Sequence, residues 1–229
     1  MIVRSRLAAV RDRVARAAER IHRDPSSIRI VAVSKTFSAD RVRAAADAGQ
    51  LDFGENKVQE ALEKIAATGD LPLRWHLVGH LQSNKARKAA GSFDVIHSID
   101  DEVLLRKVDE AAQAAGRHVD LLIQVDLAGE PTKHGARPDE LPSLLSAERG
   151  RQSARVRGLM LLPPATIDPE RGRAWFAALR TLRDRLLDGG VDSALLAELS
   201  MGMSHDFEVA VEEGATMVRI GTAIFGERP

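Results

Sequence analysis

The chain has 229 residues, of which 44% are hydrophobic, so it is long enough to bury a substantial core. Its 33 Lys and Arg residues balance its 33 Asp and Glu residues, which argues against binding nucleic acid or anionic membranes through overall charge. Without any Cys, disulfides and thiolate metal sites are excluded. No apolar run approaches the roughly 18 residues of a membrane span, and the first twenty residues lack the apolar segment of a secretion signal. We therefore expect a cytoplasmic protein.

The chain begins with an amphipathic helix over residues 3–22, in which apolar side chains recur at helical spacing opposite a charged face. Strand and helix patterns then alternate to the end of the chain. The predicted strands cover residues 30–34, 51–54, 74–79, 94–98, 119–126, 156–161, 195–200 and 216–220. The predicted helices that follow the first seven strands cover residues 38–48, 56–67, 83–90, 101–115, 138–147, 169–188 and 204–213.

Strands that alternate with helices predict an α/β fold with a parallel sheet. Eight such units at this length predict a closed (β/α)8 barrel of the TIM type, with an extra N-terminal helix (about residues 2–23) packed outside it. Because neither a linker nor a change of composition divides the chain, we expect residues 1–229 to form a single domain. An open doubly wound sheet is the alternative. The first strand is not followed by a Gly-x-Gly-x-x-Gly motif, which argues against a dinucleotide-binding fold.

Lys35 follows the first predicted strand, in the segment Ser34-Lys35-Thr36. Barrel enzymes carry their sites at the carboxyl ends of the strands, so Lys35 is expected at the mouth of a cavity. An amine held partly out of water has a lowered pKa and can attack an aldehyde. In the alternative interpretation, Lys35 has no chemical role and its amine simply reaches solvent from the end of the strand.

Small and hydroxyl-bearing residues follow the last two predicted strands, namely Ser200 and Ser204 after one and Gly221 and Thr222 after the other. In barrels these two loops commonly bind phosphate, through hydroxyls and through backbone N–H groups at helix N-termini. Ser204 is also in the position to cap the helix predicted at 204–213, a role that is compatible with phosphate binding.

A nucleophilic lysine together with a phosphate site favours pyridoxal 5′-phosphate (PLP), which carries an aldehyde and a phosphate on one ring. Arg219 would then lie between the two sites and face the pyridine nitrogen. Its permanent charge would keep that nitrogen unprotonated and make the ring a weaker electron sink. His76 alternates with apolar residues and could point into the barrel mouth, although a single strand histidine is more often structural. The seven histidines show no metal-binding spacing, so no metal site is predicted.

Long segments resemble the pyridoxal-phosphate homeostasis proteins, which are single-domain relatives of the alanine racemase barrel. The matching segments are VAVSKT at 31–36, FGEN at 53–56, WHLVGHLQSNK at 75–85, GLM at 158–160, LSMGMSHD at 199–206 and VRIGTAIFG at 218–226. The resemblance implies that Lys35 carries PLP as an internal aldimine, and that Lys35 is the catalytic residue if there is one. It also implies cofactor contacts from a wider set of residues: Asn56, His76, Met160, Ser200, Ser204, Arg219, Gly221 and Thr222.

The resemblance further implies a protein that binds, buffers and delivers PLP to apo-enzymes and so affects the balance of amino acids and keto acids. Lys85 and Lys133 are candidates for a second acceptor of the cofactor during delivery. Since the second domain of alanine racemase is missing, a monomer is expected.

Two enzymatic functions remain as alternatives. An amino-acid racemase needs a second acid/base, which alanine racemase supplies as a Tyr from its second domain. Because this chain has no Tyr, we expect no efficient racemase activity. A Schiff-base aldolase would also use a lysine and a phosphate site on a barrel, but it would hold no coloured cofactor.

Overall fold

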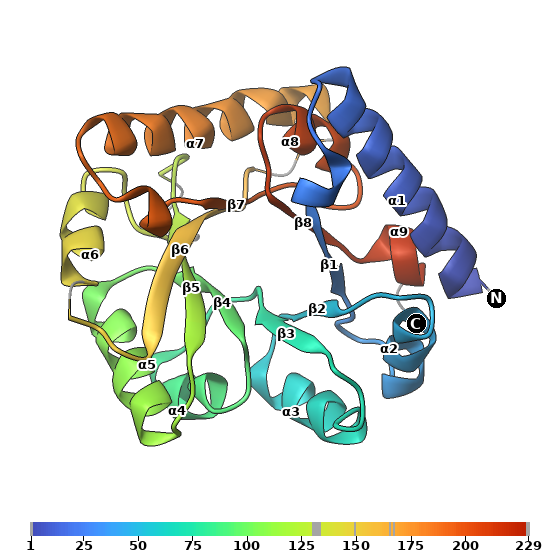
Figure 1. Ribbon diagram of the computed structural model, residues 1–229, viewed down its shortest axis with the longest axis horizontal. Coiled ribbons are helices and arrows are strands. Elements are labelled where there is room, and N and C mark those ends of the chain that lie inside the picture. The colour runs from blue at the N-terminus through green and yellow to red at the C-terminus, as the bar shows by residue number, and fades with distance from the viewer. Residues whose placement is uncertain (1, 130–133, 149, 165, 167, 228–229) are drawn as a thin grey trace.

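Eight parallel strands close into a barrel in the computed structural model, with helices around the outside (Figure 1). The structure describes residues 2–129, 134–148, 150–164, 166 and 168–227. The strands are β1 (Arg29–Val33), β2 (Asp52–Glu55), β3 (Arg74–Leu77), β4 (Val95–Ile99), β5 (Val119–Val125), β6 (Ala154–Leu161), β7 (Glu198–Ser200) and β8 (Met217–Ile220). Each strand pairs with the next, and β8 pairs back onto β1. The predicted barrel is confirmed, and the open sheet is wrong.

The helices and short 3-10 turns follow the strands in the predicted alternation. The α-helices are α1 (Ile2–Arg20), α2 (Ala39–Ala46), α3 (Val58–Ala67), α4 (Ala86–Ala90), α5 (Glu102–Ala114), α6 (Leu141–Ala147), α7 (Glu170–Asp188), α8 (Phe207–Glu212) and α9 (Thr222–Phe225). The 3-10 turns are η1 (Pro25–Ser27), η2 (Ser83–Lys85) and η3 (Ser193–Leu195). In the described part of the chain, no helix has both the length and the apolar character needed to cross a bilayer.

Helix α1 packs outside the barrel, against α2, α8 and α9 (Figure 1). Its apolar face is buried along the whole helix, as the helical spacing predicts. Arg13 of α1 contacts two residues of α8. Its guanidinium lies 4.5 Å from the centre of the Phe207 ring and pairs with Glu208 at 2.8 Å. The arginines of α1 thus include one that fastens the helix to the barrel.

Two predicted elements near the chain's C-terminus begin later than expected. Strand β7 starts only at Glu198, because Asp192 caps the 3-10 turn η3 and holds the preceding residues out of the sheet. Helix α8 starts at Phe207, so Ser204 does not cap it as predicted. The Ser204 hydroxyl is used elsewhere, because it accepts hydrogen bonds from the backbone N–H groups of Gly221 and Ala223.

Polar side chains share the inside of the barrel with apolar ones. One small apolar cluster contains Val31, Val33 and Val78, and another contains Leu122, Met160 and Met217. A hydrogen bond from β4 to β7, two strands that are not neighbours in the sheet, joins His97 to Ser200 at 2.9 Å. Since such a bond has to cross the inside of the barrel, the interior contains a buried polar connection.

Candidate functional site

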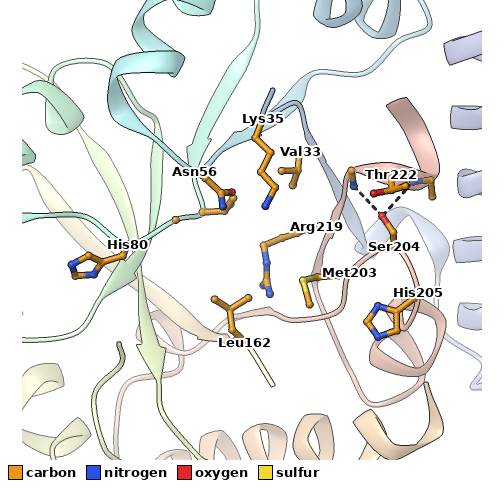
Figure 2. A pocket seen from close by; sticks show the side chains of 14 residues that line it. Val33, Lys35, Asn56, His80, Leu162, Met203, Ser204, His205, Arg219 and Thr222 are labelled. Carbon is orange, nitrogen blue, oxygen red and sulfur yellow. Dashed lines mark hydrogen bonds between the residues drawn. The ribbon is translucent and has the colours of Figure 1, made fainter. Parts of the chain in front are cut away.

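A cavity of about 750 Å³ opens at the carboxyl ends of the strands, and we call it the mouth cavity (Figure 2). It is lined by residues at or just beyond the carboxyl ends of six of the eight strands: Val33, Lys35, Asn56, Val78, Gly79, His80, Leu162, Met203, Ser204, His205, Arg219, Gly221, Thr222 and Ala223. This volume lies in the range of small-molecule and cofactor sites. The cavity is therefore the candidate binding site.

Six of the nine residues predicted to bind cofactor line this cavity together: Lys35, Asn56, Ser204, Arg219, Gly221 and Thr222. The other three, His76, Met160 and Ser200, do not line it. Each of them is fully buried inside the barrel. Direct contact between these three residues and a cofactor stays a prediction. Two of them, His76 and Ser200, belong to a line of hydrogen bonds that leads to Arg219.

Lys35 stands just beyond β1, where the chain turns sharply. Figure 2 shows its side chain reaching into the mouth cavity, with the amine pointing towards Arg219. The turn depends on Thr36, which adopts a left-handed conformation with φ of 69°. This conformation is rare for a β-branched residue. The Thr36 N–H donates to Glu60 Oε1 at 2.5 Å, which holds the turn in place.

A group of polar and charged residues lies behind Lys35, and we call it the lysine cluster (the buried Ser34, Glu55 and Lys64 and the half-buried Glu60). The Lys64 amine donates to the Ser34 carbonyl oxygen at 2.7 Å, to Glu55 Oε1 at 2.6 Å and to Glu60 Oε1 at 2.8 Å. Through Ser34 and through the bond of Glu60 to Thr36, it holds both residues that flank Lys35. The cluster thus fixes the backbone that presents the Lys35 side chain.

The two carboxyl groups of the lysine cluster respond differently to burial. Burial raises the pKa of Glu55, although hydrogen bonds from Lys64 and Ser34 oppose the rise. Glu60 is less buried; burial acts to raise its pKa too, but the bonds from Lys64 and Thr36 outweigh that effect and lower it. One oxygen of Glu55, Oε2, is buried without a hydrogen-bond partner among the described residues. Lys64 is therefore essential to the burial of Glu55.

An anion cradle is formed where the loop after β7 meets the start of α9. The Ser204 hydroxyl oxygen accepts from Gly221 N–H at 3.1 Å and from Ala223 N–H at 3.3 Å (dashed in Figure 2). Backbone N–H groups that converge on one oxygen are typical of phosphate sites. The loop reaches this position through Gly202, whose φ is 91° and whose missing Cβ would lie 2.5 Å from Ala210 Cβ. A larger residue at 202 would displace the cradle.

Arg219 on β8 forms one wall of the mouth cavity and is 4% exposed. Its Nη1 donates to Ser200 Oγ at 2.7 Å and its Nη2 to the Leu161 carbonyl oxygen at 2.8 Å. Burial lowers the pKa of Arg219 to about 10, so the guanidinium remains charged at neutral pH. These two bonds fix the guanidinium plane at the cavity.

Below Arg219, five side chains from five strands form a continuous line, which we call the histidine chain (Arg219, Ser200, His97, His76 and Asp52). Ser200 Oγ lies 2.9 Å from His97 Nδ1, and His97 Nε2 lies 2.8 Å from His76 Nδ1. His76 Nε2 then lies 2.9 Å from Asp52 Oδ1. The line connects the cavity to Asp52 at the start of β2, at the opposite end of the barrel.

The directions of these hydrogen bonds follow from the chemistry of the two ends. A carboxylate only accepts, so His76 Nε2–H donates to Asp52, and the Nδ1 of a neutral His76 must accept. His97 Nε2–H therefore donates to His76, which leaves His97 Nδ1 to accept from the Ser200 hydroxyl. The Ser200 oxygen in turn accepts from Arg219. Each member donates to the next, from Arg219 to Asp52.

Both histidines fit this neutral assignment. Burial lowers the pKa of His97 well below the usual value, and the neighbouring His76 and Arg219 lower it further. Burial also lowers the pKa of His76, although its bond to Asp52 acts in the opposite direction. The histidine chain thus has one cation at the cavity, one carboxylate at the far end and neutral groups between them.

Comparison with known proteins identifies the family. Residues 5–229 match the family model of the alanine racemase N-terminal domain. The chain belongs to this family. Within the racemase-barrel family it is 45% identical to the pyridoxal phosphate homeostasis protein of Pseudomonas aeruginosa, over 97% of this chain and 94% of that protein. It is 42% identical to the protein of the same name from Aquifex aeolicus, over 97% of each chain. The predicted resemblance is confirmed.

Solved structures of the racemase-barrel family agree with this assignment. PipY of Synechococcus elongatus, solved with PLP bound, has a TM-score of 0.85 and 42% identity over 98% of this chain and 100% of that chain. An alanine racemase from Clostridium difficile has a TM-score of 0.74 at 14% identity, and this chain covers 57% of it. At that low identity the likeness to the racemase shows the fold alone.

Three residues that line the mouth cavity were not predicted from the sequence, and two lysines predicted to take part in delivery are not seen at it. Leu162, Met203 and His205 line the mouth cavity and could have been found only by their places just after predicted strands. Lys85 is exposed on η2 and does not line the cavity. Lys133 lies outside the described residues.

Proposed function

We propose that this chain binds PLP in the mouth cavity through Lys35 and serves in PLP homeostasis and delivery. One observation carries the proposal: an amine, an anion cradle and a fixed guanidinium converge in one cavity of suitable size. PLP has a complementary group for each of them, namely its aldehyde, its phosphate and its ring nitrogen. The PLP-bound structure of PipY and the name shared by the curated relatives support the same assignment.

The residues present fit the cofactor on their own chemistry. Lys35 supplies the amine for a covalent link to the aldehyde, and the N–H groups of Gly221 and Ala223 can donate to a phosphate oxygen as they now donate to Ser204. Thr222 adds a hydroxyl at the same place. When bound, PLP supplies an electrophilic aldehyde and an electron-withdrawing ring.

Arg219 is proposed to face the ring nitrogen. The guanidinium lines the cavity and is held by Ser200 and by the Leu161 carbonyl, so its direction is fixed before a ligand enters. Because it can only donate hydrogen bonds, the ring nitrogen has to accept and stays unprotonated. This makes the ring a weaker electron sink than a ring whose nitrogen faces a carboxylate.

A role in delivery is proposed from the name that the curated relatives share, and the sequence argues against the racemase alternative. The sequence contains no Tyr, so the residue type that alanine racemase uses is not available. We keep the sequence-based expectation of a cytoplasmic monomer that hands PLP to apo-enzymes. Incubation of the PLP-loaded protein with an apo-enzyme of the PLP-dependent class should restore that enzyme's activity faster than an equal amount of free PLP. Equal or slower reactivation would remove the delivery role.

The binding proposal is tested by visible absorption after incubation with PLP and gel filtration. Wild type is expected to retain a visible band that depends on Lys35, and Lys35→Ala should lose it. Lys85→Ala is the matched control, because Lys85 is exposed outside the cavity, and should keep the band. A band that survives in Lys35→Ala, or a wild type that stays colourless, would contradict the proposal.

A further inference from the structure

Three side chains with metal-binding groups meet beside the mouth cavity: His80, Asp100 and His134. One ligand atom from each, a ring nitrogen or a carboxylate oxygen, lies within 4.8 Å of the other two. His80 follows β3, Asp100 follows β4 and His134 comes after β5. The three residues therefore stand at the carboxyl ends of three consecutive strands, which is the end of a barrel where sites are built.

The two imidazole rings are stacked face to face. Their centroids are 3.5 Å apart and their planes differ by 7°. Asp100 Oδ2 lies 3.8 Å from His80 Nδ1, and its side chain is only 15% exposed. A cation placed among these groups would gain a carboxylate and two ring nitrogens.

We propose that His80, Asp100 and His134 bind one divalent transition-metal ion of the zinc class. Two imidazoles and one carboxylate are a donor set that suits Zn²⁺, Co²⁺ and Ni²⁺, whereas Mg²⁺ and Ca²⁺ prefer oxygen ligands alone. In a tetrahedral zinc site the ligand atoms are about 3.4 Å apart, so the three side chains have to close around the ion. The two rings also have to turn out of their stack, because a ring nitrogen binds a metal in the plane of its ring and two parallel planes cannot both contain the ion. Both histidines are exposed enough to rotate.

Three protein ligands leave one coordination position for water or for an anionic group. Because His80 also lines the mouth cavity, that open position lies beside the place proposed for PLP. The site itself needs no cofactor, so it is independent of the proposed function. The sequence predicts no metal site because the ligands lie on three separate strand ends rather than at a recognisable spacing.

Titration of the purified full-length protein with Co²⁺ tests the site, because a bound Co²⁺ with mixed nitrogen and oxygen ligands has visible d–d bands. Calorimetry with Zn²⁺ gives the stoichiometry. The variants are His134→Ala and Asp100→Asn, which remove one ligand each. His118→Ala is the matched control, since His118 is exposed and stands outside the cluster. Lys35→Ala separates metal bound by the protein from metal bound by the cofactor.

We expect one equivalent of metal in wild type, His118→Ala and Lys35→Ala. His134→Ala and Asp100→Asn should each weaken binding by at least about tenfold, the loss that changes around a metal's ligands already cause. Circular dichroism of the metal-free variants should match wild type, because these side chains are not part of the core. Equal affinity in wild type and His134→Ala, no saturable binding in wild type, or loss of binding in Lys35→Ala would overturn the proposal.

Discussion

The lysine cluster and the histidine chain both bury polar groups under the mouth cavity, but they do so by different means. The lysine cluster places one ammonium between two carboxylates and is held by charge. The histidine chain is held by hydrogen bonds through neutral groups and keeps its charges at its two ends. The first fixes the residues around Lys35, and the second fixes Arg219. The two proposed cofactor contacts thus rest on supports that should fail under different conditions.

The two supports differ most in how their contributions to stability change as the pH falls. The raised pKa of Glu55 means that the folded state holds this proton more tightly than the unfolded state. Its burial penalty is therefore present above the folded pKa and relieved as the pH falls through it. The lowered pKa values of His76 and His97 act in the opposite direction. Acid should relieve the burial penalty of Glu55, although the lowered pKa of Glu60 acts against this, and it should weaken the histidine chain.

Breaking the lysine cluster should have the largest effect. Lys64→Met leaves the fully buried Glu55 without its cation, and removing one partner of a buried pair costs about 3–5 kcal/mol. Urea unfolding followed by circular dichroism measures the loss, which should shrink in acid as Glu55 takes up a proton. Lys107→Met is the control, because Lys107 is exposed and its loss should change stability by less than about 0.5 kcal/mol. A similar small loss for both variants would contradict this account.

Breaking the histidine chain at Ser200 should have the next largest effect. Ser200→Ala removes the acceptor of Arg219 and the donor to His97, both buried, at a cost of about 3 kcal/mol. Ser98→Ala is the matched control on β4. The Ser98 hydroxyl is buried without a hydrogen-bond partner among the described residues, so its removal should be neutral or slightly stabilising. An equal loss of unfolding free energy in Ser200→Ala and Ser98→Ala would show that the histidine chain adds no stability.

The neutral histidines predict a pH dependence of stability. The unfolded histidines take up protons at about pH 6.5, whereas the pKa values of His97 and His76 are lowered in the folded state, so stability falls as the pH drops below that value. Each histidine contributes a slope of at most about 1.4 kcal/mol per pH unit. Urea unfolding at several pH values should show a steep slope in wild type and a shallower one in His97→Gln. Parallel slopes would mean that His97 is charged in the folded state.

The smallest expected effect concerns the turn after Lys35. Thr36 is β-branched and left-handed, and such strain costs about 1–2 kcal/mol. Asn tolerates this conformation, so Thr36→Asn should stabilise the fold by about 0.5–1 kcal/mol while keeping the N–H that bonds to Glu60. Thermal unfolding of the variant beside wild type measures the change. A clear loss of stability would show that the threonine side chain has a role of its own.

The fold could be predicted because its signals are local. Each strand and helix leaves its own pattern of apolar side chains, and eight repeats of that pattern define the barrel. Lys35, Ser204 and Gly221 could be predicted for a related reason, because functional sites in parallel barrels lie at the carboxyl ends of the strands. The ends of elements could be predicted less well. Helix α8 begins three residues after Ser204, because the Ser204 hydroxyl bonds to the backbone of Gly221 and Ala223, which follow much later in the sequence.

The interior connections could not be predicted, because they depend on which side chains face each other across the barrel. The sequence indicates that His76 could point into the barrel, but its partner His97 stands on another strand and has no sequence signal of its own. Arg219 was predicted at the ring nitrogen without the Ser200 bond that directs it. His80, Asp100 and His134 were likewise separate residues until the barrel brought their strand ends together.

Borohydride reduction of the PLP-loaded protein, followed by peptide mass mapping, shows directly which lysine holds the cofactor. Reduction makes the link between lysine and cofactor permanent, so the modified residue can be read from the peptide masses. We expect the added mass on the peptide that contains Lys35 and on no other lysine. Modification at Lys85, or spread evenly over the exposed lysines, would contradict the claim that the mouth cavity holds the cofactor through Lys35.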